Sequence, residues 1–126
     1  MSDRESNAAS ALASFVGMAS EGASAFSEEA EKTIDPTQAP WPVPADSTAT
    51  YRPAHGGHQY KFRFHNGRGA SVIRHRYSYG YEDGLWELAV LNAQGNLDYT
   101  TEITDDVIGR LTPGDVARIL ERIAAL

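Results

Sequence analysis

Two histidines separated by two glycines, in His55-Gly56-Gly57-His58, are the first residues whose types and spacing could do chemistry. Imidazole nitrogens are common metal ligands, and a helix would bring side chains three residues apart onto one face. The two glycines disfavour a helix, and a strand would point the two rings to opposite faces. Because the chain also has no cysteine, we predict no metal site here.

Candidates for nucleophilic or acid–base catalysis are equally few. Ser71 follows Gly69-Ala70 but lacks the second glycine of a nucleophile elbow. Asn66-Gly67-Arg68-Gly69 lacks the strand-to-helix context of a phosphate-binding loop. Asp105–Asp106 and Glu82–Asp83 fit the first turn of a helix and a tight turn, where carboxylates need no catalytic role. We therefore predict no catalytic residue, no cofactor and no enzyme activity.

The stretch 58–77 is the most unusual in composition. It holds five of the eleven lysines and arginines, three of the four histidines and no carboxylate, in a chain of 126 residues with net charge −6. Acidic segments flank it on both sides, and segregated charge of this kind is typical of interaction surfaces. The sequence predicts a partner-binding surface made of Lys61, Arg63, His65, Asn66, Arg68, Arg74 and Arg76.

Strict alternation of aromatic and basic residues over 60–65 predicts a strand, and the run 70–79 predicts its return strand. Asn66-Gly67 is a strong hairpin signal, and we expect a loop with an even number of residues. That loop length fixes which residues share a face. One face would then carry Tyr60, Phe62, Phe64, Ser71, Ile73, His75 and Tyr77, and the other Lys61, Arg63, His65, Ala70, Val72, Arg74 and Arg76.

Two further strands are expected at 85–92 and 97–103, and a short helical turn capped by Thr104 at 104–111. The final helix should begin after an N-cap at Thr112, with Pro113 in its first position and Asp115 in its first turn. Its apolar stripe needs a sheet to cover it. The predicted fold class is α+β, a four-stranded antiparallel meander with the C-terminal helix packed on one face, preceded by an N-terminal helical arm and a Pro-rich linker.

The chain divides into three segments by composition. Residues 1–34 form an Ala/Ser-rich acidic arm with an amphipathic stripe, 35–50 a Pro-rich linker, and 51–126 the α+β domain. Trp41 could anchor a partner or fold back onto the domain. Residues 8–32 could mediate a homo-oligomer. Because no apolar run is long enough for a membrane helix and the N-terminus lacks the basic start of a signal peptide, we expect a cytoplasmic protein without membrane contact.

Three runs carry a resemblance to a known group: Asn66-Gly67-Arg68-Gly69-Ala70-Ser71-Val72, Leu85-Trp86-Glu87-Leu88-Ala89-Val90 and Thr104-Asp105-Asp106-Val107-Ile108-Gly109. Together they resemble small uncharacterised proteins encoded by bacteriophages and prophages. The resemblance covers residues 60–126 and implies a mobile-element context. It brings no activity that could be transferred to particular residues.

In that context the leading prediction is a non-enzymatic binding protein that inhibits or modulates a host defence complex, in the manner of anti-CRISPR proteins. The contact would be made by the basic face or by the acidic arm. A nucleic-acid-binding protein that uses the same basic face is the first alternative, although the net charge of −6 opposes long-range attraction to phosphates. A virion or assembly component is the second.

Overall fold

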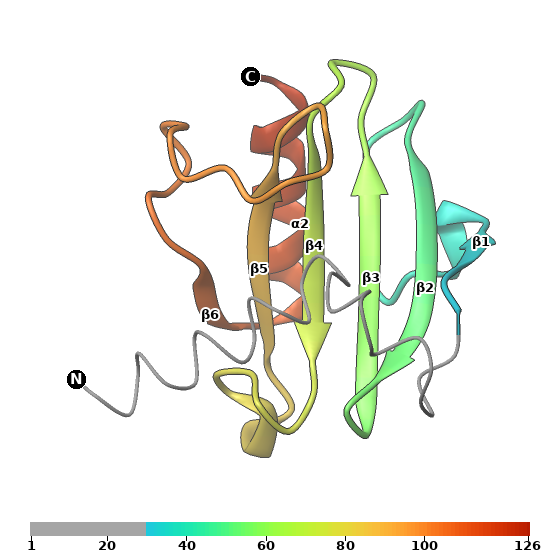
Figure 1. Cartoon of the computed structure of the whole chain (residues 1–126), viewed down its shortest axis with the longest axis vertical. Helices are drawn as coiled ribbons and strands as arrows, with labels where there is room; N and C mark the ends of the chain where they lie inside the picture. The colour runs from blue at the N-terminus through green and yellow to red at the C-terminus, as the bar shows by residue number, and fades with distance from the viewer. Residues whose placement is uncertain (1–29) are drawn as a thin grey trace.

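Six antiparallel strands, joined in chain order, form one sheet in the computed structural model, which describes residues 30–126. One helix packs against one face of that sheet, behind β4 and β5 in Figure 1. The strands are β1 (Lys32–Ile34), β2 (Thr48–Ala54), β3 (Gly57–Arg63), β4 (Gly69–Arg74), β5 (Trp86–Leu91) and β6 (Ile108–Leu111), and the helix is α2 (Pro113–Ala124). Two short 3-10 turns, η3 (Pro36–Gln38) and η4 (Tyr81–Asp83), complete the elements.

The α+β meander with a C-terminal helix is confirmed, but the prediction of four strands is wrong. β1 and the start of β2 come from residues that were predicted as arm and linker, and they extend the sheet beyond β3. The prolines in this region lie between the two strands, where no ladder hydrogen bond is needed. Residues 1–29, which include most of the predicted helical arm and of the oligomerisation segment 8–32, lie outside the described residues.

The predicted strand at 97–103 is also wrong, because β6 occupies the place beside β5 instead. In the segment 97–103 only Leu97 forms a bridge, with Leu91. Local side-chain bonds turn the backbone after it: the Asp98 carboxylate accepts from the Thr100 amide at 2.9 Å. Thr104 does cap a local turn by accepting from the Asp106 amide at 3.1 Å, but residues 108–111 that follow form a strand and not a helix.

The register of the β3–β4 hairpin differs from the predicted one by one residue. Arg63 pairs with Gly69, and inside that pair Phe64 and Arg68 close a three-residue loop, with the Phe64 amide 2.8 Å from the Arg68 carbonyl. Gly67 takes φ +88° in this loop, as three-residue hairpins require at that place. An odd loop places Tyr60 and Phe62 on the same face as Val72 and Arg74, so the predicted segregation of aromatic and basic faces is wrong.

The face beneath α2 holds the main core. The helix begins as predicted, because Thr112 and Asp115 form a reciprocal capping box and Pro113 occupies the first position. Its inward side chains are fully buried: Val116, Leu120 and Ile123. They pack against Phe62, Phe64, Ala70, Val72, Trp86, Leu88 and Val90 of the sheet, together with Trp41.

The opposite face of the sheet has a smaller apolar cluster. Ile73 and Ala89 are fully buried there beneath Val107, Leu97 and Tyr99 of the long connection between β5 and β6. This connection covers the apolar residues on one face of β4 and β5, and α2 covers those on the other face. No helix in the described part of the chain is long and apolar enough to span a bilayer.

Candidate functional site

Two of the predicted partner-binding residues, Asn66 and Arg68 at the β3–β4 turn, bond to distant parts of the chain. The side-chain nitrogen Nδ2 of Asn66 donates to the backbone carbonyls of Ile123 at 2.9 Å and Ala124 at 3.2 Å, at the end of α2. The last carbonyls of a helix lack partners within the helix, so Asn66 acts as an external cap. Arg68 forms an ion pair with Asp98 at 3.1 Å. Hydrogen bonds from Thr100, with a smaller effect of Arg68, hold the pKa of Asp98 below its usual value.

Arg63, Lys61 and His65 also lie toward this end of the sheet. The Arg63 guanidinium donates to two loop carbonyls, Gly67 at 2.9 Å and Ala93 at 3.0 Å, and so ties two turns together. Lys61 lies 3.7 Å from the Glu31 carboxylate; burial lowers its pKa and Glu31 partly opposes that effect. His65 is exposed beside a cavity of about 430 Å³.

The remaining two predicted residues, Arg74 and Arg76, lie at the opposite end of the hairpin. Arg76 is exposed, with its guanidinium 5.6 Å from the centre of the Tyr77 ring. Arg74 instead lies on the face that carries α2, with its guanidinium 4.9 Å from the Trp86 ring. The seven predicted residues therefore do not form one surface. Arg74 is separated from the other cations and lies beside a group of aromatic rings.

This group is here called the aromatic–arginine surface and consists of Tyr51, His58, Tyr60, Arg74 and Trp86. Three of its members are on β2 and β3, with which α2 makes fewer contacts than with β4, β5 and β6; Arg74 ends β4 and Trp86 begins β5. Trp86 is its buried floor, and the other four side chains are half-buried. Adjacent strands bring them together, because Tyr51 pairs with Tyr60 and His58 pairs with Arg74 in the ladders.

The rings of the aromatic–arginine surface touch one another in inclined arrangements. Centroid distances are 4.9 Å between Tyr51 and Tyr60, 5.8 Å between Tyr51 and His58, and 5.9 Å between Tyr60 and Trp86. Such edge and tilted contacts stabilise aromatic pairs by about 0.5–1.5 kcal/mol each beyond area burial. The surface is therefore held rigid by its own contacts.

Polar groups of this surface are arranged around His58. The Tyr51 hydroxyl lies 2.7 Å from Nδ1 of His58. Burial, with a further contribution from Arg74, lowers the pKa of His58 and so favours the neutral ring at pH 7. Burial also raises the pKa of Tyr60. The guanidinium of Arg74 is the positive charge of the surface.

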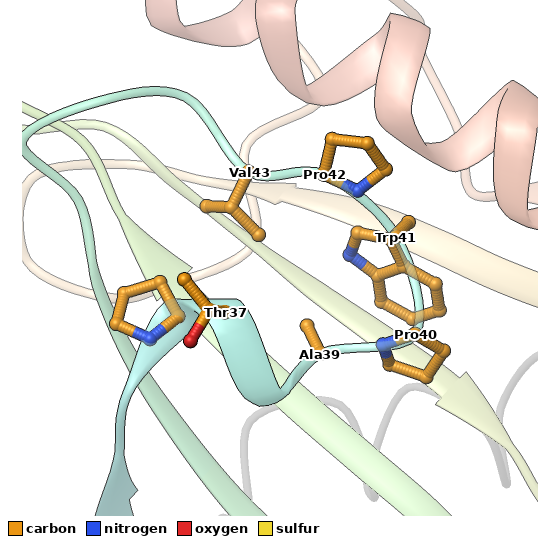
Figure 2. A pocket seen from close by; sticks show the side chains of 7 residues that line it. Thr37, Ala39, Pro40, Trp41, Pro42 and Val43 are labelled. Carbon is orange, nitrogen blue, oxygen red and sulfur yellow. The ribbon is translucent and has the colours of Figure 1, made fainter.

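An apolar cavity of about 490 Å³ borders the aromatic–arginine surface through Trp41. The Trp41 ring is 5.4 Å from Tyr60 and 4.7 Å from Trp86, and it is 3 % exposed, so this residue folds back into the core. Val43 lies across the cavity from the indole in Figure 2. Three prolines, Pro36, Pro40 and Pro42, provide rigid walls.

A buried serine, histidine and glutamate occur together near the β4–β5 loop, but they do not form a catalytic triad. Ser78 Oγ bonds the backbone of His75, donating to its carbonyl at 2.8 Å and accepting from its amide at 3.0 Å. The His75 ring accepts from the Tyr77 amide at 3.1 Å, and Glu87 accepts from the Tyr79 amide at 2.8 Å. These bonds shape a loop. Within residues 30–126, no three His, Asp or Glu side chains are placed to hold a metal ion.

Sequence reasoning did not place Tyr51, His58 and Tyr60 in a candidate site. Tyr60 was placed on a buried face, and His58 was considered only as a metal ligand with His55. In the structure His55 is in the β2–β3 turn at φ +48°, with its ring 4.9 Å from His75, and belongs to a different cluster. A signal was present in the sequence: the alternation of ring-bearing residues at 58, 60 and 62 begins before the strand predicted at 60–65.

In comparisons with known proteins, no family model, curated protein or solved structure matches this chain.

Proposed function

We propose that this chain is a non-enzymatic binding protein that contacts a protein partner through the aromatic–arginine surface. The observation that carries the proposal is the gathering of half-exposed Tyr51, His58 and Tyr60 around Arg74, on a rigid sheet face. Tyrosine, tryptophan and arginine dominate the residues that contribute most to protein–protein affinity. The cavity beside Trp41 offers an adjoining recess for an apolar partner side chain.

A protein partner fits this surface better than a nucleic acid does. The net charge of −6 repels a polyanion at long range. Bases stack on flat, accessible rings, whereas the Tyr51 and Tyr60 planes are inclined by 51° and pack against each other. The predicted phosphate contacts Arg63 and Arg68 already bond acceptors of this chain.

The resemblance to phage- and prophage-encoded proteins supports a narrower version of this proposal. In that context the partner is a component of a host defence complex in the host cytoplasm, and binding inhibits or modulates it. The resemblance supports this narrower version, and the site geometry supports a protein partner. An assembly role, the remaining alternative, would need contacts made by residues 8–32.

The test compares capture by the full-length chain with capture by a surface variant. Immobilised protein would be incubated with nuclease-treated lysate of the host bacterium, and bound proteins quantified by mass spectrometry. We expect a specific protein set that is lost with Tyr51→Ala/Arg74→Gln. The matched control is Tyr81→Ala/Arg118→Gln, which removes an exposed tyrosine and an arginine elsewhere and should retain the set.

A second measurement addresses nucleic acid directly. Labelled single-stranded and duplex DNA would be titrated with the chain, and fluorescence anisotropy recorded at low and high salt. Sub-micromolar, salt-sensitive binding that disappears in the Tyr51→Ala/Arg74→Gln variant would refute the protein-partner proposal and establish the nucleic-acid alternative.

A further inference from the structure

Arg74 is a half-buried cation for which no carboxylate partner is found among residues 30–126, unlike three other cations of the sheet. Lys61, Arg68 and Arg110 each lie within 4 Å of one: Glu31, Asp98 and Asp83. In the described part of the chain, Arg74 contacts only the Gly84 carbonyl at 3.4 Å and the Trp86 ring at 4.9 Å. A half-buried guanidinium that lacks a counter-charge is costly, and an external anion would remove that cost.

The contacts of Arg74 also fix its orientation. Stacking on Trp86 and the bond to Gly84 hold the guanidinium against the sheet, so little side-chain entropy remains to be lost on binding. A guanidinium presents five N–H donors in a planar fork, and one weak carbonyl bond leaves most of them available. Preorganised donors of this kind suit a planar, two-oxygen acceptor.

A second donor lies beside the guanidinium. His58 is the ladder partner of Arg74, and its ring centre is 6.3 Å from that of Trp86. A phenol hydroxyl is a stronger donor than a neutral imidazole N–H, which favours Nδ1 as the acceptor of the Tyr51 hydroxyl. In that tautomer the ring carries its proton on Nε2. No acceptor among residues 30–126 is bonded to that Nε2–H. The chain therefore places an imidazole donor and a guanidinium together over one indole.

We propose that His58 and Arg74 form a carboxylate-binding subsite of the aromatic–arginine surface, which receives an Asp or Glu side chain of the protein partner. This inference rests on the proposed function and specifies the chemistry of the partner. One guanidinium charge with a neutral imidazole matches one negative charge. A phosphate dianion would leave a charge uncompensated among half-buried rings, which is unfavourable.

The groups around His58 predict that carboxylate binding will change the pKa of its imidazole. Tyr51 on β2, Tyr60 on β3, Arg74 on β4 and Trp86 on β5 surround the ring, and Arg74 is the charged member. Burial and the Arg74 charge hold the pKa of His58 below its ordinary value. A carboxylate bound between the two residues stabilises the protonated ring, so it raises this pKa.

The experiment is an NMR titration of the imidazole signals in the full-length chain. His58 would be titrated with pH in sodium chloride, sodium acetate and sodium phosphate at equal ionic strength, with exposed His65 as the internal reference. We expect acetate to raise the His58 pKa by roughly half a pH unit relative to chloride, and to leave His65 unchanged. Arg74→Gln should abolish the response, and Arg118→Gln should retain it.

Two results would overturn the inference. An unchanged His58 pKa in acetate, or the same rise in Arg74→Gln, would show that the pair does not bind a carboxylate. A larger rise in phosphate than in acetate would show that the subsite prefers a phosphate group. Because the probe is a small ion, a failed protein capture together with a positive acetate response would refute the proposed function alone.

Discussion

Buried His75 should make the stability of this protein fall steeply in mild acid. Its side chain is fully buried, and Nδ1 accepts from the Tyr77 amide at 3.1 Å. Burial, followed by the positive field of His55 when protonated and of Arg52 and Arg76, lowers the pKa of His75 from 6.5 to about 4. The ring therefore stays neutral in the folded protein at pH values where it is protonated in the unfolded chain.

The sign and size of the effect follow from this difference in pKa. Between pH 6.5 and about 4 the unfolded state binds more protons, so the free energy of unfolding decreases as the pH falls through this window. Each pH unit of difference corresponds to about 1.4 kcal/mol, which limits the whole effect to about 3 kcal/mol. With some screening by solvent, we expect His75 to account for a loss of about 2 kcal/mol between pH 7 and pH 4.5.

Urea unfolding followed by tryptophan fluorescence measures this loss, since Trp41 and Trp86 are both buried. His75→Asn keeps an acceptor near the position of Nδ1 and removes the titrating group. We expect it to be less stable at pH 7, because it loses buried ring volume, but to lose about 2 kcal/mol less than wild type on going to pH 4.5. His65→Asn, at an exposed turn position, should follow wild type.

If the free energy of unfolding depends on pH in the same way in wild type and His75→Asn, the reasoning is refuted. If wild type and His75→Asn lose the same free energy between pH 7 and pH 4.5, His75 is not the group responsible. Where the variant is too unstable to measure, the imidazole signal of His75 in the wild type gives the same answer: titration near pH 6.5 would contradict a pKa lowered to about 4. His58, whose pKa is also lowered, contributes equally to both proteins and cancels in the comparison.

Two further predictions concern the hairpins. Gly57→Ala should destabilise the protein by more than about 2 kcal/mol in urea unfolding, because a Cβ there would lie 2.0 Å from the Arg74 carbonyl oxygen and force β3 away from β4. Gly114→Ala is the control in the first turn of α2, where a Cβ would meet only the side chains of Arg118 at 3.7 Å and Thr112 at 3.9 Å. It should be neutral or stabilising, and equal effects of the two substitutions would refute the packing argument. Asn66→Ala should cost about 1–2 kcal/mol and lower hydrogen-exchange protection in the last turn of α2, whereas unchanged protection would show that the helix end does not need its cap.

Local signals in the sequence were sufficient for some elements and not for others. The start of α2 was predictable because Thr112, Pro113 and Asp115 are all within one turn, and their hydrogen bonds involve no distant residue. The hairpin at 66–67 was also predictable in place, since Asn-Gly favours a turn. Its loop length was not, because Asn66 bonds to carbonyls of α2 that are 57 and 58 residues further along the chain.

The strands at the two edges of the sheet depend on which of several segments of the chain pairs with each edge. Residues 97–103 alternate as a strand should, but β5 has one outer edge, and residues 108–111 occupy it. In the same way, proline content gave residues 35–50 the appearance of a linker, whereas Trp41 places this segment in the main core. Neither outcome could be predicted from the local sequence, because each depends on which segment of the chain buries more apolar surface when two segments could occupy the same place.

The one-residue difference in hairpin register decides what kind of surface this protein has. In the predicted register, Arg74 would stand with Lys61 and Arg63 on a purely basic face, and tyrosines would be buried on the other. In the observed register Arg74 joins the rings of the helix-bearing face and remains half-buried. A basic strip attracts any polyanion, whereas a single guanidinium held among tyrosines requires a partner that supplies both a matching charge and apolar contact. Under the proposed function, the three-residue loop at Asn66 therefore matters because its register places Arg74 among the tyrosines and not in a basic strip.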